Sequence, residues 1–190
     1  MTIRYKVRIN PKLFLMNIYD QIFATDKRYN APYRYKLKIV LKWVKKNQFR
    51  NVLDVGSGRG HYLRLLRKNT IEVTGLEPSK VIVDTLNDYD VINDDILGLV
   101  KQGKQWESLI CMDVLEHIEP AEIENTVSAL ATLSPKALLG IANHSDVWHG
   151  TELHLIQEGP SWWKKLLPRY YNNINCIYED DLYFVFDVGR

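Results

Sequence analysis

Short apolar runs alternate with amphipathic stretches over most of the chain. Apolar side chains recur at the spacing of one helix face between residues 33 and 46, at Leu37, Val40, Leu41 and Val44. Further helices are predicted at 61–68, 79–87 and 120–132. Apolar runs of strand length lie at 51–55, 71–76, 91–92, 108–112 and 137–142. Strands that alternate with helices in this way are typical of a parallel sheet covered on both faces.

The two ends of the chain complete this pattern. Residues 12–23 are predicted to form a helix. The segment 143–159 is predicted to be a long loop, and 161–167 a short helix. Apolar runs at 176–178 and 182–188 predict an antiparallel pair of strands. We therefore expect an α/β fold: a doubly wound, mostly parallel seven-stranded sheet with a C-terminal antiparallel hairpin and N-terminal helices.

A glycine-rich loop follows the first predicted strand. That strand carries Asp54 near its end, and Gly56, Gly58 and Gly60 then occupy every second position, with Ser57 after the first glycine. Glycine lets the backbone turn sharply and lets a ligand lie against it. The helix that follows points its free N–H groups at the same place. The loop predicts a nucleotide pocket, and its spacing differs from the G-x-G-x-x-G of dinucleotide enzymes, which disfavours a nicotinamide dehydrogenase.

Acidic residues also follow the next two predicted strands. Glu77 and Pro78 end the second strand, and Asp94, Asp95 and Ile96 follow the third. In an open parallel sheet, ligands bind beyond the carboxyl ends of the strands, where an acidic side chain can accept both ribose hydroxyls of a nucleoside. The spacing therefore predicts that these acidic residues lie around the same pocket as the glycine loop.

Residues 53–60 read L-D-V-G-S-G-R-G, which resembles the first motif, L-D-V-G-x-G-x-G, of the class I S-adenosylmethionine-dependent methyltransferases. The resemblance implies a Rossmann-like methyltransferase domain, which we place at 36–190, after a basic helical lid segment at 1–35. It also implies that the cofactor is S-adenosylmethionine.

The same resemblance assigns roles within the pocket. Glu77 would accept hydrogen bonds from the ribose hydroxyls. Asp95, or Asp94 as the alternate, would accept from the adenine amino group, and Ile96 would pack on the adenine ring. The run D-V-L-E-H at 113–117 resembles one that lines the methionine end of the cofactor in this family. The expected cofactor-binding residues are Asp54, Gly56, Ser57, Gly58, Gly60, Glu77, Pro78, Asp95, Ile96, Met112 and Asp113.

Two histidines are the candidate catalytic residues. Methyl transfer to nitrogen can proceed without a strong base, whereas transfer to oxygen often needs a general base or a metal. His117 follows the fourth strand at the ligand-binding edge, and its ordinary pKa suits proton transfer near neutral pH. A structural histidine at a helix start is the alternative. His154 lies in a stretch resembling a histidine-bearing loop that closes over the active site in many small-molecule methyltransferases.

A metal site is a further alternative. Asp113, Glu116 and His117 resemble the E-x-x-E-H motif of metal-dependent RNA 3′-terminal 2′-O-methyltransferases, but an aspartate replaces the first glutamate. The later histidines are spread along the loop rather than clearly paired, at His144, His149 and His154. No residue is therefore assigned to a metal from the sequence alone.

Charge and composition narrow the choice of partners. The net charge is +2, but residues 1–50 hold 13 Lys and Arg against two Asp. Such an asymmetry can mark a face for an anionic partner, but a solvated basic helix that covers the sheet gives the same pattern and is the simpler interpretation. Tyrosines interleave with basic residues in a predicted lid that could hold an anionic acceptor or simply pack as a helix: Tyr19, Tyr29, Tyr33 and Tyr35 with Arg28, Arg34 and Lys36.

Membrane and redox features point to an ordinary cytoplasmic enzyme. No run of about 18 apolar residues is present, so we expect no membrane partner. Cys111 and Cys176 lie in strand-like runs, which favours free thiols in a reducing cytoplasm. The leading hypothesis is a methyltransferase acting on a small or medium metabolite, which could be anionic. The alternatives are an RNA-directed 2′-O-methyltransferase and a non-catalytic module that binds the cofactor.

Overall fold

The computed structural model describes residues 11–26, 29 and 31–190. Within them, seven strands form one sheet in the order β3-β2-β1-β4-β5-β9-β8. The parallel strands are β1 (Asn51–Val55), β2 (Glu72–Leu76), β3 (Val91–Ile92), β4 (Ser108–Met112) and β5 (Lys136–Ala142). β9 (Tyr183–Gly189) runs antiparallel to β5, and β8 (Asn173–Glu179) runs antiparallel to β9. The predicted fold class is confirmed.

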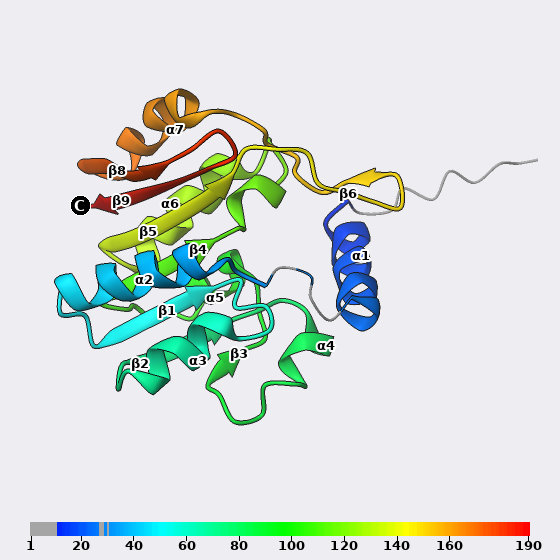
Figure 1. Cartoon of the computed structure of the whole chain (residues 1–190), viewed down its shortest axis with the longest axis horizontal. Coiled ribbons are helices and arrows are strands. Elements are labelled where there is room, and N and C mark those ends of the chain that lie inside the picture. Colours follow the sequence, from blue (N-terminus) through cyan, green and yellow to red (C-terminus); the bar gives the residue numbers. More distant parts are fainter. Residues whose placement is uncertain (1–10, 27–28, 30) are drawn as a thin grey trace, which may run out of the picture.

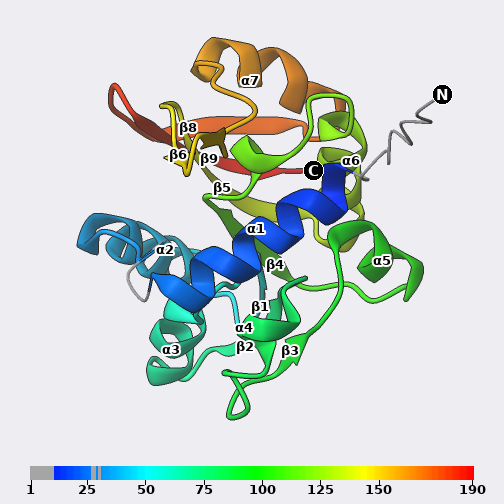
Figure 2. The ribbon, with the colours of Figure 1, turned by 90° about the vertical axis from the view of Figure 1, so that its right-hand side faces the viewer.

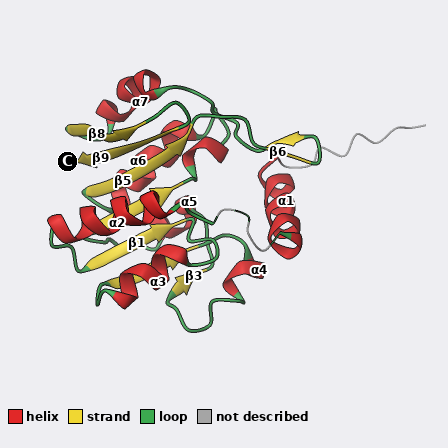
Figure 3. Ribbon diagram, in the orientation of Figure 1, coloured by secondary structure: helices red, strands yellow, loops and turns green. Residues whose placement is uncertain are grey.

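Helices cover both faces of the sheet (Figure 1 and Figure 3). One face packs against α2 (Arg34–Lys46) and α3 (His61–Lys68), and the other against α5 (Ile96–Lys101), α6 (Ile123–Leu133) and α7 (Pro160–Leu166). Successive residues of β4 supply the two cores in turn, since Ile110 packs on the α2 face and Cys111 on the α6 face. Burial on both faces explains why β4 reads as a continuous apolar run.

Helix α1 (Pro11–Thr25) lies across the carboxyl edge of the sheet rather than on a face (Figure 2). It packs against α4 (Lys80–Val83), the short helix that follows β2. Because a parallel sheet presents its ligand-binding loops at the carboxyl edge, α1 covers the region where the sequence predicts the site. None of the described helices has the length and apolarity that a membrane crossing requires.

Several elements differ from the sequence prediction in extent. The helix expected at 79–87 ends at Val83, and the one expected at 120–132 begins at Ile123. The unpredicted helix α5 is six residues long and is capped by Asp95. The loop at 143–159 contains a small antiparallel pair, β6 (Val147–Trp148) and β7 (Thr151–Glu152).

Strand β8 extends beyond the run predicted at 176–178. It is one of the two edge strands of the sheet, and its residues alternate between exposed and half-buried positions. The polar side chains on its outward face, such as Asn173 and Asn175, hide the strand from a search for apolar runs. Cys176 is accordingly half-buried, whereas Cys111 is buried, and both thiols are free.

Candidate active site

The glycine loop has the conformation that its composition predicts. Gly56, Gly58 and Gly60 have φ values of 69°, 48° and 71°, in the left-handed region that favours glycine. The Gly56 N–H donates to the Leu76 carbonyl at 2.8 Å, which ties the loop to β2. A Cβ added at Gly56 would lie 2.5 Å from Val114 Cγ2, so this glycine also allows close packing.

Glu77 lies under the loop. Its Oε2 accepts from the Gly58 N–H and its Oε1 from the Ser79 N–H, both at 2.9 Å. The side chain is buried, and burial raises its pKa despite these two hydrogen bonds. Asn93, which the sequence reasoning missed, donates from Nδ2 to the Glu77 carbonyl at 2.9 Å and so fixes the turn after β2. The expected contact of Glu77 with a ribose stays a prediction.

Five of the expected cofactor residues line one hollow beside the loop: Gly56, Ser57, Gly58, Met112 and Asp113. Four residues not expected from the sequence also line this cofactor hollow: Pro32, Arg59, His61 and Tyr62. Arg59 was within reach of sequence reasoning, because it lies inside the glycine motif. Pro32 was not, because it reaches the hollow from a segment distant in sequence.

Four buried polar atoms of this region lack a hydrogen-bond partner within the described chain: Asp54 Oδ2, Ser57 Oγ, Arg59 Nε and Tyr62 Oη. Buried polar groups are normally paired, so such orphans fit a ligand with polar groups. Burial, and then the neighbouring Glu77, raises the pKa of Asp54 to about 8. A Cβ at Gly58 would meet no atom closer than 3.9 Å, which leaves the open cradle that a bound cofactor needs.

Other expected residues lie outside the hollow. Gly60 precedes α3, and a Cβ there would lie 2.9 Å from Leu86 Cδ2. Asp95 accepts from the Gly98 N–H at 2.8 Å as the cap of α5, and Ile96 packs against the core. Pro78 comes just before Ser79, the N-cap of α4. Contacts of Asp95, Ile96 and Pro78 with an adenosyl group therefore stay predictions.

A second hollow adjoins the first across a buried ion pair. Lys36 Nζ lies 2.6 Å from Asp113 Oδ1, and the two side chains are 10% and 11% exposed. Asp113 lines the cofactor hollow and has a left-handed φ of 58°, a conformation uncommon for a residue with a side chain. Lys36 lines the second hollow with Tyr33, Tyr35, His144, Asp180, Asp181, Leu182 and Tyr183. The two hollows thus meet at this pair.

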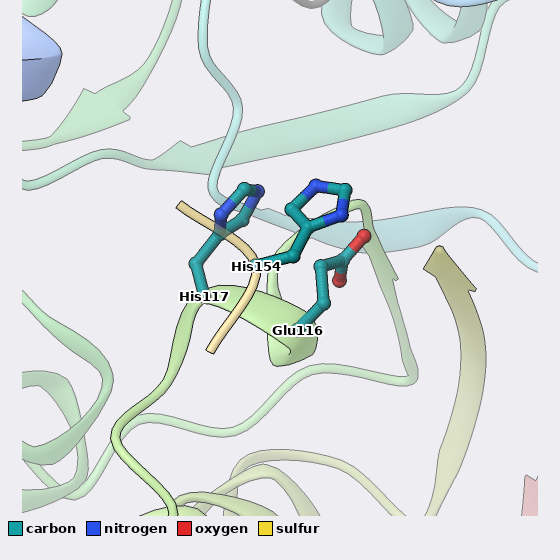
Figure 4. Close-up of side chains that lie close together, drawn as sticks. All are labelled: Glu116, His117 and His154. Carbon is teal, nitrogen blue, oxygen red and sulfur yellow. The ribbon is translucent and has the colours of Figure 1, made fainter. Parts of the chain in front are cut away.

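The two candidate catalytic histidines come together with Glu116 (Figure 4). The ring centroids of His117 and His154 are 4.8 Å apart. Burial, and then His154, lowers the pKa of His117 to about 4, and burial lowers the pKa of His154. Both imidazoles are therefore neutral near pH 7. Burial, and then Asp113, raises the pKa of Glu116 to about 8.

Helix α1 closes over these groups from the carboxyl edge. Tyr19 Oη lies 2.7 Å from His117 Nδ1, and Ser79 Oγ donates to Asp20. Arg59 Nη2 donates to the carbonyls of Phe23 and Asp26, at 2.6 and 2.8 Å. The lid role of the tyrosine-bearing segment stays a prediction. Arg28 of the predicted cluster, and the basic residues Arg4, Lys6 and Arg8, lie outside the described residues.

Comparisons with known proteins agree on one family. A family model described as a methyltransferase domain matches residues 27–182. The ubiquinone biosynthesis O-methyltransferase of Coxiella burnetii is 29% identical over 105 residues, which cover 50% of this chain and 45% of that protein. The chain thus spans about half the length of the curated relatives it matches.

Solved structures extend the likeness over nearly the whole chain. Magnesium protoporphyrin IX methyltransferase from Synechocystis PCC 6803, crystallised with S-adenosylmethionine, has a TM-score of 0.69 at 17% identity and covers 96% of this chain and 100% of its own. The 1,6-didemethyltoxoflavin-N1-methyltransferase of Burkholderia thailandensis has a TM-score of 0.69 at 12% identity and covers 99% and 93%. Identities this low show a common fold.

Proposed function

This chain belongs to the methyltransferase-domain family, and we propose that it transfers a methyl group from S-adenosylmethionine to an oxygen of a small aromatic metabolite. The expected cofactor is confirmed as that of the family. The observation that carries the proposal is the junction of the two hollows at the pair Lys36–Asp113. A methyl donor in one hollow and an acceptor in the other would meet there.

Residues around the cofactor hollow offer groups that its expected occupant would need. The backbone at Gly56 and Gly58 leaves room for close approach, and the unpaired Asp54 Oδ2 and Ser57 Oγ can bond polar groups of the cofactor, directly or through water. The Glu77 carboxylate, fixed by two backbone N–H groups, would accept from the ribose hydroxyls. When bound, S-adenosylmethionine supplies an electrophilic methyl group, whose bond to sulfur breaks as the bond to the acceptor forms.

The second hollow favours an aromatic acceptor. The rings of Tyr33 and Tyr35 stack at 6.0 Å and those of Tyr35 and Tyr178 at 5.1 Å, and the Tyr33 ring is 71% exposed. Such a surface can stack on a planar ring. Lys36 at its inner end can attract an anionic or phenolic oxygen. The name of the Coxiella burnetii relative, an O-methyltransferase of ubiquinone biosynthesis, supports an oxygen acceptor.

His117 and His154 are the proposed catalytic residues. The carbonyls of Leu153 and His144 lie 2.9 and 2.6 Å from their respective Nδ1 atoms. A carbonyl oxygen only accepts, so each Nδ1 carries the proton and each Nε2 keeps its lone pair. A neutral imidazole of this kind can take the proton of an acceptor hydroxyl, or hold a cation that makes the hydroxyl more acidic. The free thiols support a cytoplasmic location as part of the proposal.

Labelled methyl transfer tests this function. The purified chain would be incubated with S-adenosylmethionine carrying a labelled methyl group and with phenols, dihydroxylated aromatics or an RNA pool. We expect label in an aromatic hydroxyl. The Tyr33→Ala substitution removes a stacking partner worth about 0.5–1.5 kcal/mol, so KM for the acceptor should rise roughly two- to tenfold. Tyr170→Ala, remote from both hollows, should leave KM unchanged.

The other outcomes decide between the alternatives. Label in RNA alone would contradict the small-molecule assignment and favour the RNA-directed alternative. Cofactor binding without transfer to any acceptor would favour the non-catalytic module. An equal KM for the Tyr33→Ala variant and the parent chain would remove the second hollow as the acceptor site.

A further inference from the structure

We propose that Glu116, His117 and His154 bind a divalent first-row transition-metal cation. The sequence alone assigned no metal ligand, because the later histidines were spread along the loop. Cation binding can be tested without the methyl-transfer reaction, whereas the catalytic role of the cation rests on the proposed function.

The geometry brings three suitable donors to one place. One ligand atom from each residue, an imidazole nitrogen or a carboxylate oxygen, lies within 4.8 Å of the other two. Glu116 and His117 come from the turn after β4, and His154 comes from the loop after β7 (Figure 4). Glu116 and His154 are buried and His117 is half-buried, so the donors lie inside the molecule.

Each histidine is oriented by a hydrogen bond from the ring nitrogen that does not face the cation. The Nδ1 atoms of His117 and His154 donate to the backbone carbonyls of Leu153 and His144, which leaves each Nε2 as the ligating atom. Ligating histidines in metal sites characteristically donate their other ring N–H in this way.

Glu116 supplies an independent observation. Its Oε1 accepts from the Ala142 N–H at 2.9 Å, whereas its Oε2 is buried without a hydrogen-bond partner in the described part of the chain. An unpaired oxygen on a fully buried carboxyl group is costly unless a ligand satisfies it. A cation held with the two imidazoles would provide that missing partner.

The donor types select the class of cation. Two imidazoles and one carboxylate suit Mn²⁺, Fe²⁺, Co²⁺ or Zn²⁺, whereas Mg²⁺ and Ca²⁺ prefer oxygen ligands throughout. Asp113, which the sequence motif would have made a fourth ligand, is instead held by Lys36 at 2.6 Å. Three protein ligands leave open positions, as catalytic metal sites require.

The neighbouring His144 connects the proposed cation site with the second hollow, which would give the cation a role. The His144 side chain lines that hollow, and its carbonyl holds His154. An acceptor hydroxyl bound to the cation would release its proton to solvent more readily, because the cation stabilises the oxyanion. The oxygen then forms its bond to the methyl carbon as the carbon–sulfur bond breaks, with the electron pair left on sulfur.

Titration with Mn²⁺ or Zn²⁺ alone, followed by calorimetry and metal analysis after dialysis, tests the site. Glu116→Gln keeps an oxygen that can accept from Ala142 but removes the charge. His154→Asn and His149→Asn make the same change at two positions of one loop, and His149 is exposed. We expect one tightly bound cation per chain, at least tenfold weaker binding in Glu116→Gln and His154→Asn, and unchanged binding in His149→Asn.

The outcomes separate this inference from the proposed function. Thermal melting and S-adenosylmethionine binding check that Glu116→Gln is folded. Absence of stoichiometric cation binding, or equal binding by Glu116→Gln and the parent chain, would overturn the site. Methyl transfer that persists after chelation would remove the cation's catalytic role but leave the proposed function standing. Cation binding without any methyl transfer would contradict the proposed function but leave the cation site standing.

Discussion

Asp54 and Ser57 show how a single polar atom can mark a binding site. The sequence placed both residues at the cofactor because an acidic residue and a glycine loop follow an apolar strand. It could not show that Asp54 Oδ2 and Ser57 Oγ are buried without a partner among the described residues, because that depends on which neighbours the fold brings close. The same limit applies to Glu116, because its unpaired Oε2 in the described chain and its nearness to His154 both depend on the fold.

The raised pKa of Asp54 gives a pH-dependent stability. This group has an ordinary pKa of 3.8 and a folded-state pKa of about 8, so the folded chain holds the proton more tightly. Its contribution to stability is complete below pH 3.8 and is lost as the pH rises through 8. Each unit of pKa difference corresponds to about 1.4 kcal/mol, so the loss amounts to several kcal/mol in order of magnitude.

Asp54→Asn should therefore flatten the fall in unfolding free energy between pH 4 and pH 8. Urea denaturation of the cofactor-free chain at several pH values measures it. Asp88→Asn, at an exposed position, should keep the slope of the parent chain. Identical slopes in the Asp54→Asn variant and the parent chain would show that Asp54 is not held in its protonated form.

Helix α1 and the loop at 143–159 carry the parts of the site that local patterns could not predict. Apolar spacing predicted α1 as a helix, and loop residues predicted the later segment. Neither pattern predicts which distant residues these segments contact, since Tyr19 and His117, which are in contact, lie 98 residues apart in sequence. The sheet strands were easier to predict because their apolar runs are set by burial on both faces.

Arg59 links α1 to the glycine loop, so its removal should loosen the helix. The side chain donates to the carbonyls of Phe23 and Asp26 and lies over the Phe23 ring, with 5.3 Å from Cζ to the ring centroid. Two charge-assisted hydrogen bonds are worth about 1.5–3 kcal/mol each, so amide exchange in 18–26 should speed up at least tenfold in Arg59→Ala.

Arg64→Ala is the matched control, because Arg64 is exposed on α3. Amide exchange over 18–26 in Arg64→Ala should equal that of the parent chain. The amides of strand β1 should exchange at the same rate in the parent chain and in both variants. If Arg59→Ala left exchange in α1 unchanged, the helix would be held to the loop by other contacts.

At the scale of the whole chain, the cofactor hollow adjoins a second hollow, which we propose as the acceptor site. The cofactor hollow was predictable in part, because the glycine loop that lines it belongs to the sequence motif, whereas Pro32 reaches it from a distant segment. The second hollow joins residues from the start of α2, from the loop after β5 and from the turn between β8 and β9. Short local patterns do not reveal such distant contributions, which is why the acceptor class depends on the structure.

Calorimetric titration of S-adenosylmethionine into the purified chain tests the central claim most directly. We expect one site per chain, at least tenfold weaker binding in Glu77→Gln, and unchanged binding in the control Glu72→Gln, which alters an exposed carboxylate on β2, the strand that Glu77 follows. Melting curves without ligand would confirm that both variants are folded. Absence of binding by the parent chain, or equal affinity in the folded Glu77→Gln variant, would contradict the assignment of this pocket.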